Sequence, residues 1–295
     1  MSAAGPFPSR RHFVALLAAA GSVVISGCAA DASGATHGGA LAGPRDVPVQ
    51  VPAWLLARQA LAQVAADPLV AAGLARTRVY ELVQPGQQPL ALAGALPAVI
   101  FASAAQLVQT VQNSGLPART QAVVYDPEAW PFTPAGEQRD PVTAAAGAAR
   151  AARARGLQFI VAPALNLTTV LAPGSRTPRA QLFLELDLPA RLAEHADMIE
   201  FQAQSLERDA ASYSGFVAQA AQQARLASPS VGLLAGVSTN PPAALVTVAQ
   251  LVTAIRATQH LVDGFWLNVP SPGPQCPTCN PPRPEIAIAT LLAFV

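Results

Sequence analysis

The chain has 295 residues, of which 52% are hydrophobic, and its formal net charge is +1. Beyond Arg10-Arg11 it contains no basic run, and this charge balance argues against a nucleic-acid partner. All 18 basic residues are arginine, so mechanisms that need a lysine Schiff base or a lysine general base are excluded.

The first 28 residues have the pattern of an export signal. Arg10-Arg11 precedes a short apolar run, residues 14–25, which ends in Ser26-Gly27-Cys28. The run is shorter than the roughly 20 residues that span a bilayer. The arginine pair resembles a twin-arginine signal. The ending resembles the bacterial lipoprotein cleavage box, which implies that Cys28 becomes the lipidated first residue. The alternative is an ordinary cleaved signal with a coincidental cysteine.

These features predict three regions: a signal over residues 1–27, a flexible tether over 28–48, and one domain over 49–295. The tether is rich in Ala, Gly, Ser and Pro and has no apolar period. The expected location is outside the cytoplasm, on the outer face of the membrane, with the lipid on Cys28 as the anchor. About 247 residues suit a single α/β barrel.

Residues 52–75 have apolar positions at helical spacing and predict a first helix. From there, short apolar runs alternate with long Ala-rich stretches of helical period. The predicted strands are Arg78–Val83, Ala98–Ala102, Gln121–Tyr125, Gln158–Ala162, Met198–Ala203, Val231–Val237 and Gly264–Val269. The predicted helices are Ala104–Asn113, Pro134–Arg155, Ala180–His195, Glu207–Ala227, Pro242–His260 and Glu285–Phe294.

Repeated strand–helix units leave a closed (β/α)8 TIM-like barrel or an open doubly wound sheet. No Gly-x-Gly-x-x-Gly follows the first predicted strand, and no Gly-x-x-x-x-Gly-Lys-Ser/Thr occurs in the chain. We therefore expect a barrel without a nucleotide or other cofactor. Only seven strands are predicted, so an eighth, irregular one is expected between Gln84 and Leu96.

Polar residues at the carboxyl ends of the predicted strands are the candidates for chemistry, because active sites of barrels lie there. Asp126 and Glu128 follow the strand 121–125 on one face. Two close carboxylates raise one another's pKa, which suits acid catalysis. The alternative is that Asp126 caps a turn and Glu128 is solvated.

The strand 198–203 has the clearest site pattern. Glu200, Gln202 and Gln204 share one face, while Ile199 and Phe201 lie on the other. The apolar face suits the helices, so the polar face is expected inside the barrel. Buried polar groups need partners, and this row is therefore a ligand site or a structural hydrogen-bond network.

Other strand ends offer groups that bind sugars, because indole rings stack on sugar faces and amides bond to hydroxyls. The candidates are Trp130, Asn166, Trp266 and Asn268, with Ser238, Thr239 and Asn240 as further polar residues. Each of these alone is more often a cap or a core residue, so only their convergence on one site counts.

Cys276 and Cys279 lie in a Pro-rich stretch, where a local disulfide is the favoured interpretation for an exported protein. A redox site is the second possibility. A metal site is not expected, since none of the four histidines has matching spacing.

The run Tyr125–Pro134, the row Glu200–Gln204 and Trp266-Leu267-Asn268 together resemble secreted bacterial barrels related to glycoside hydrolases. The resemblance is at the level of the fold, and the Asp-x-x-Asp-x-Asp-x-Glu motif of chitinase-type barrels is absent. It implies a carbohydrate or other cell-envelope ligand. The oligomeric state cannot be predicted from the sequence.

The first functional hypothesis is a glycoside hydrolase with Asp126 or Glu128 as general acid and Glu200 as second carboxylate. It requires these groups to face each other across an open pocket. The second hypothesis is a non-catalytic barrel that binds a glycan or another extracellular ligand. A transporter-linked binding protein is the third hypothesis, because such a protein has two lobes and the sequence shows no duplication of that kind.

Overall fold

The computed structural model describes residues 52–204, 206–241, 245–273, 276 and 279–295. The predicted signal, Cys28 and the tether lie outside the described residues. No helix in the described part of the chain is long and apolar enough to cross a membrane.

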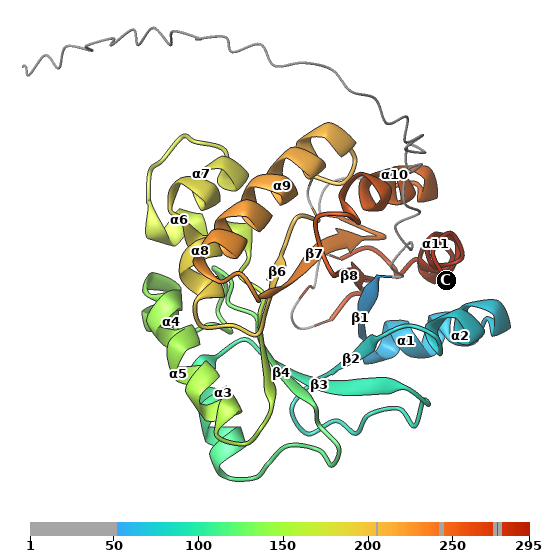
Figure 1. The fold of residues 1–295 in the computed structure, drawn as a ribbon, viewed down its shortest axis with the longest axis horizontal. Coiled ribbons are helices and arrows are strands. Elements are labelled where there is room, and N and C mark those ends of the chain that lie inside the picture. The colour runs from blue at the N-terminus through green and yellow to red at the C-terminus, as the bar shows by residue number, and fades with distance from the viewer. Residues whose placement is uncertain (1–51, 205, 242–244, 274–275, 277–278) are drawn as a thin grey trace, which may run out of the picture. The chain divides into compact units, whose positions relative to one another are not determined.

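Eight parallel strands form a closed barrel in sequential order, which confirms the predicted TIM-like fold (Figure 1). The barrel closes where Trp54 of the first strand pairs with Phe265 of the last. The strands are β1 Ala53–Ala57, β2 Val79–Val83, β3 Ala95–Phe101, β4 Ala122–Tyr125, β5 Gln158–Val161, β6 Met198–Phe201, β7 Gly232–Ser238 and β8 Gly264–Asn268.

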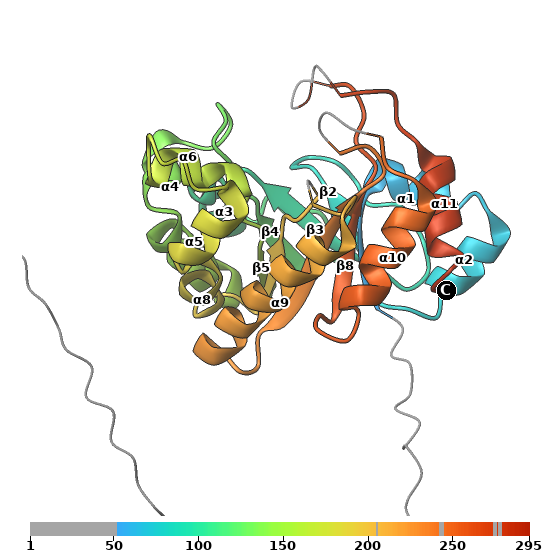
Figure 2. The ribbon, with the colours of Figure 1, turned by 90° about the horizontal axis from the view of Figure 1, so that it is seen from above.

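Helices cover the outside of the strands (Figure 2). They are α1 Arg58–Val64, α2 Pro68–Leu74, α3 Ala104–Gln112, α4 Ala135–Arg139, α5 Pro141–Arg153, α6 Thr168–Leu171, α7 Arg179–Glu185, α8 Leu188–Ala193, α9 Ala210–Ala227, α10 Val248–Thr258 and α11 Pro284–Leu291, with a 3-10 turn at Leu165–Leu167. Side chains of Ser103, Asp140, Asp209 and Thr247 cap the first turns of α3, α5, α9 and α10.

Alternate residues of each strand pack into two separate apolar clusters. Val123, Ile199 and Phe201 belong to the outer cluster between strands and helices. Val124 and Met198 belong to the inner cluster, which fills the barrel. Both faces of the strands are therefore buried, as in parallel sheets covered by helices.

The predicted helix over residues 52–75 is wrong in its first part. Residues Ala53–Ala57 form β1, and the helical residues begin only at Arg58. Ala and Leu dominate this segment and favour helix locally. Its pairing with β2 and β8 decides the strand conformation.

The irregular strand predicted between Gln84 and Leu96 is also wrong, because the eighth strand is β1. This segment instead connects β2 to β3 without a helix. Leu90 and Leu92 pack against the outer cluster in place of a helix. The fully buried Glu81 accepts a hydrogen bond from the Leu90 backbone N–H at 2.7 Å, which holds the segment on the barrel.

Two predicted helices are each divided in the structure. The prediction over 134–155 becomes α4 and α5, separated at Asp140, and the prediction over 180–195 becomes α7 and α8. The second break lies at Asp187, whose φ of 54° is left-handed and ends a helix.

Gly264 allows β1 and β8 to approach closely, and its replacement by Ala is expected to loosen barrel closure. A Cβ at this position would lie 2.8 Å from the carbonyl carbon of Ala53, a backbone atom that cannot rotate away. Gly264→Ala is expected to reduce the free energy of unfolding by about 1–3 kcal/mol, measured by urea denaturation.

The matched control is Gly147→Ala in α5, where a new Cβ meets no atom closer than 3.9 Å. Ala is favoured over Gly inside a helix, so this control should raise stability by about 0.5–1 kcal/mol. Equal stability changes in the two variants would contradict the assigned role of Gly264.

Candidate functional site

The candidate residues of β4 and β6 lie at the carboxyl end of the barrel and are joined by hydrogen bonds. The side-chain amide of Gln202 donates to Asp126 Oδ1 at 2.6 Å and to the Ala162 carbonyl at 2.8 Å. These bonds connect the ends of β4, β5 and β6. The amide therefore fixes the orientation of the Asp126 carboxyl group, which is only 8% exposed.

Glu128 is held by Asn166, which follows β5. Asn166 Nδ2 donates to Glu128 Oε2 at 3.2 Å, and Asn166 Oδ1 accepts from the Ala129 backbone N–H at 2.8 Å. The Thr133 hydroxyl accepts from the Glu128 backbone N–H at 3.1 Å. Glu128 is partly exposed, so its carboxyl is both oriented and accessible.

The pKa values of the three candidate carboxyls are all raised. Burial is the main cause for each, and it raises the pKa of Asp126 and Glu200 furthest. The charge of Glu128 adds to the rise at Asp126, and the charges of both add to the rise at Glu200. The hydrogen bonds from Gln202 and Asn166 act in the opposite direction. The three groups therefore form one electrostatic cluster that retains protons well above the usual pH for carboxyls.

Glu200 is closed off from solvent. Its exposed fraction is 0%, and neither carboxyl oxygen has a hydrogen-bond partner among the described residues. Its Oε1 and the Gln204 amide occupy the space where a Cβ of Gly236 would lie. The glycine in β7 thus makes room for both side chains. The open pocket required for catalysis by Glu200 is not present at this carboxyl group, and contact with a ligand would require Gln204 or its neighbours to move.

The two candidate tryptophans lie in different surroundings. Trp130 is partly exposed, donates from Nε1 to the Thr133 hydroxyl at 2.9 Å and stacks edge-on with Phe132 at 5.1 Å. Trp266 is 8% exposed and belongs to the inner cluster, where it pairs in register with Gly236. Its Nε1 has no partner among the described residues. Asn268 is partly exposed at the end of β8.

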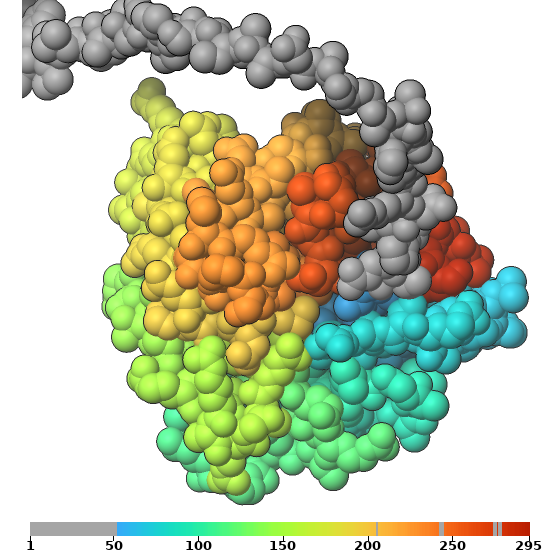
Figure 3. Space-filling view, viewed as in Figure 1, coloured from blue at the N-terminus to red at the C-terminus, as the bar shows by residue number. Residues whose placement is uncertain are grey.

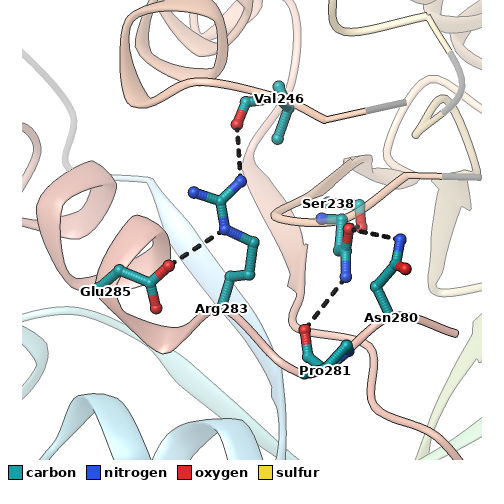
Figure 4. A network of polar contacts seen from close by, with 7 residues as sticks. Ser238, Val246, Asn280, Pro281, Arg283 and Glu285 are labelled. Carbon is teal, nitrogen blue, oxygen red and sulfur yellow. Dashed lines mark hydrogen bonds and ion pairs between the residues drawn. The ribbon is translucent and has the colours of Figure 1, made fainter.

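A second polar network joins the segments that follow β7 and β8 (Figure 4). Asn240 donates to the Pro281 carbonyl at 3.2 Å and accepts from Asn280 at 3.4 Å. Arg283 donates to Glu285 at 3.1 Å and to the Val246 carbonyl at 3.5 Å. Asn240 thus acts as a structural clamp, one of the alternatives that the sequence left open.

The predicted disulfide is present between Cys276 and Cys279, with a Cα–Cα distance of 5.3 Å. It closes a short loop of the segment after β8. Within the described ranges, no three His, Cys, Asp or Glu side chains gather closely enough to hold a metal ion.

The sequence did not indicate Glu207, which follows β6 and is only 1% exposed. Its Oε1 accepts from the Ser238 backbone N–H at 3.2 Å, and burial raises its pKa to about 8. The nearby Tyr213 hydroxyl donates to the Gly236 carbonyl at 3.2 Å. A glutamate just before a helix resembles an ordinary surface residue in sequence, so no local signal marks its burial.

The fold is similar to that of several solved barrels. A putative alpha-L-fucosidase from Bacteroides thetaiotaomicron VPI-5482 matches at 8% identity and a TM-score of 0.47, over 79% of this chain and 90% of that chain. A chitinase from Chromobacterium violaceum ATCC 12472 matches at 17% identity and a TM-score of 0.40, over 64% and 69%.

A triosephosphate isomerase from Bartonella henselae matches at 11% identity and a TM-score of 0.36, over 74% and 92%. No family model and no curated protein matches the chain. The likeness to glycoside hydrolases is therefore one of fold, and it does not assign an activity.

Proposed function

We propose that this protein is an exported lipoprotein whose barrel hydrolyses glycosidic bonds, with Glu128 as the proton donor. The observation that carries the proposal is the state of Glu128. It is partly exposed at the carboxyl end of β4, Asn166 orients its carboxyl, and burial raises its pKa. A raised pKa lets a carboxylic acid keep its proton to higher pH, where it can protonate a leaving group.

In the proposed reaction, the Glu128 proton passes to the glycosidic oxygen as the bond from that oxygen to the anomeric carbon breaks. Water then adds to the anomeric carbon and returns a proton to Glu128. Asp126 is the second carboxyl group of this site. Two carboxyls held close together favour a state in which one is ionised and the other protonated, so an ionised Asp126 favours a proton on Glu128. Gln202 orients Asp126 through the 2.6 Å hydrogen bond.

Glu200 has no place as a nucleophile in this scheme while it stays closed. Burial, together with the charges of Asp126 and Glu128, raises the pKa of Glu200 and favours its protonated form. We assign the sugar-binding contacts to the partly exposed candidates at the carboxyl end of the barrel, which are Trp130, Asn166, Gln202, Gln204 and Asn268. Trp266 is buried in the inner cluster and receives no sugar-binding role here.

A non-catalytic barrel that binds a glycan is the second candidate, and the closed Glu200 favours it. A panel of soluble glycans separates the two, with product formation followed by chromatography and binding followed by calorimetry on the same samples. Turnover supports the hydrolase. Saturable heat of binding without products supports the binding barrel and removes Glu128 from a catalytic role.

The proposed anchor has its own test. Cys28→Ser is expected to abolish incorporation of a fatty-acid label and to release the protein from the membrane fraction. Cys276→Ser with Cys279→Ser is the control, because it removes the two disulfide-bonded cysteines of the barrel and leaves the predicted cleavage box unchanged. Label retained in the Cys28→Ser variant would contradict the lipoprotein assignment.

A further inference from the structure

Positive charge is concentrated at the amino end of the barrel, opposite the candidate site. Barrel helices return antiparallel to the strands, so their last turns and the loops before each strand share this end. Nine arginines of the described residues lie there: Arg76, Arg78, Arg119, Arg150, Arg153, Arg155, Arg191, Arg225 and Arg256. The acidic residues that the structure describes in the loops before the strands at this end are Glu194, Asp197 and Asp263.

Two of these acidic residues have structural partners already. Asp197 accepts from the Phe159 backbone N–H at 2.8 Å and pairs with Arg153 at 3.5 Å. Asp263 accepts from the Leu233 backbone N–H at 2.7 Å and pairs with Arg225 at 3.0 Å. Each aspartate thus joins neighbouring strands, and its charge is balanced by its own arginine.

Four of the remaining arginines are available to a partner. Arg76, Arg78, Arg119 and Arg150 are exposed, and none forms an ion pair with a described residue. A hollow of about 470 Å³ opens at this end, with Arg78, Arg225 and the beginning of β1 at Ala53 in its lining. Figure 3 looks onto this end of the barrel, where the blue start of β1 is visible between the helices.

We propose that the amino end of the barrel docks on the surface of a lipid bilayer that carries anionic headgroups. Charge complementarity supports this partner, because surface arginines are attracted to anionic lipids. The choice of partner rests on the proposed anchor, because the predicted tether precedes β1 in the sequence and the first residue of β1, Ala53, lies at this same end. The carboxyl end, with Asp126 and Glu128, would then face away from the membrane toward its substrate.

The charges of the opposite end agree with this orientation. Burial raises the pKa of Asp126, Glu128, Glu200 and Glu207, so the acidic residues counted as charges around the carboxyl ends of the strands are Glu137, Asp140, Asp209 and Glu285. The arginines at that end are Arg58, Arg139, Arg176, Arg179, Arg208 and Arg283. The excess of positive charge is therefore larger at the amino end, which favours approach of that end to a negative surface.

The test uses residues 49–295, which form a compact unit and hold the whole closed barrel. Sedimentation with vesicles compares phosphatidylcholine alone with phosphatidylcholine plus phosphatidylglycerol. Binding is expected only to the anionic vesicles and is expected to fall steeply as salt rises. Because an arginine near such a surface changes partitioning by about fivefold, the combined Arg76→Gln, Arg78→Gln and Arg119→Gln variant should bind about 100-fold more weakly.

The matched control makes the same charge change at the other end, with Arg176→Gln, Arg179→Gln and Arg208→Gln, all exposed residues. It should bind anionic vesicles as the wild type does. Equal loss in both variants, equal binding to neutral vesicles, or tighter binding to a DNA duplex at equal phosphate concentration would overturn the proposal. Hydrolysis is measured on soluble glycans without vesicles, so failure of the proposed activity leaves this result unaffected.

Discussion

Replacing Glu128 by Gln is expected to lower kcat for glycoside hydrolysis by about 10²–10⁴-fold, the range for loss of a general acid. KM should change little, because the amide oxygen can still accept the hydrogen bond that Asn166 donates at 3.2 Å. The measurement is steady-state kinetics on the best substrate of the glycan panel. Glu194→Gln at the exposed amino end is the matched control and should retain full activity.

The pH profile provides an independent reading of the same group. Burial raises the pKa of Glu128, so the protonated acid persists to higher pH than for a solvated glutamate. Wild-type kcat should therefore fall as pH rises through this elevated pKa, and the residual activity of Glu128→Gln should lack that limb. An unchanged profile in the variant would assign the proton donor to another residue, with Asp126→Asn as the next variant to measure.

Glu207 is expected to make the stability of the barrel strongly dependent on pH. Its pKa is about 8 in the folded protein, because it is 1% exposed, against about 4.3 in an unfolded chain. Below the unfolded pKa both states are protonated and stability is fully present. As pH rises between these values only the unfolded state releases the proton, so stability falls, by about 5 kcal/mol at most.

Glu207→Gln should remove this contribution, so the stability of the variant relative to the wild type should rise as pH increases between the two pKa values. The amide oxygen can still accept from the Ser238 backbone N–H, which donates at 3.2 Å in the wild type. The measurement is urea denaturation of both proteins at a series of pH values from about 4 to about 9, a range that includes the pKa of Glu207 in the unfolded and in the folded state. Glu194→Gln is again the control.

Other buried carboxyls also lower the free energy of unfolding as pH rises. The pKa values of Asp126, Glu200 and Glu81 are all raised, mainly by burial. Their contributions are present in both proteins and cancel in the difference. A difference between variant and wild type that does not change with pH would show that Glu207 is ionised in the folded state, contrary to the prediction.

Much of the barrel was predictable because its pattern is local. Alternating apolar runs and Ala-rich stretches located seven strands within a few residues of their observed bounds. Strand alternation also predicted that Glu200 faces inward while Ile199 and Phe201 face the helices, where they join the outer cluster. The Cys276–Cys279 disulfide followed from two cysteines in one short loop.

The strand β1 was not predictable in this way. Its residues favour helix by composition, and the strand conformation depends on partners at Val79 and Phe265 that are distant in the chain. Because α1 begins at Arg58, directly after β1 ends at Ala57, the helical apolar period of the segment extends to the strand and does not indicate where the helix begins. The non-helical connection before β3 was misread for the same reason, because its leucines contact the outer cluster only in the folded barrel.

The sequence by itself determined the repeated strand–helix units and the residues that alternate toward the barrel axis, because periodicity records which side of an element is buried. Only the tertiary structure decided which of those residues a ligand can reach. Glu128 and Glu200 look alike in sequence, yet one is partly exposed and the other is closed beneath Gln204 beside Gly236. The burial of Glu207 and the arginine-rich amino end were decided in the same way, because burial and surface charge depend on segments that meet only when the barrel closes.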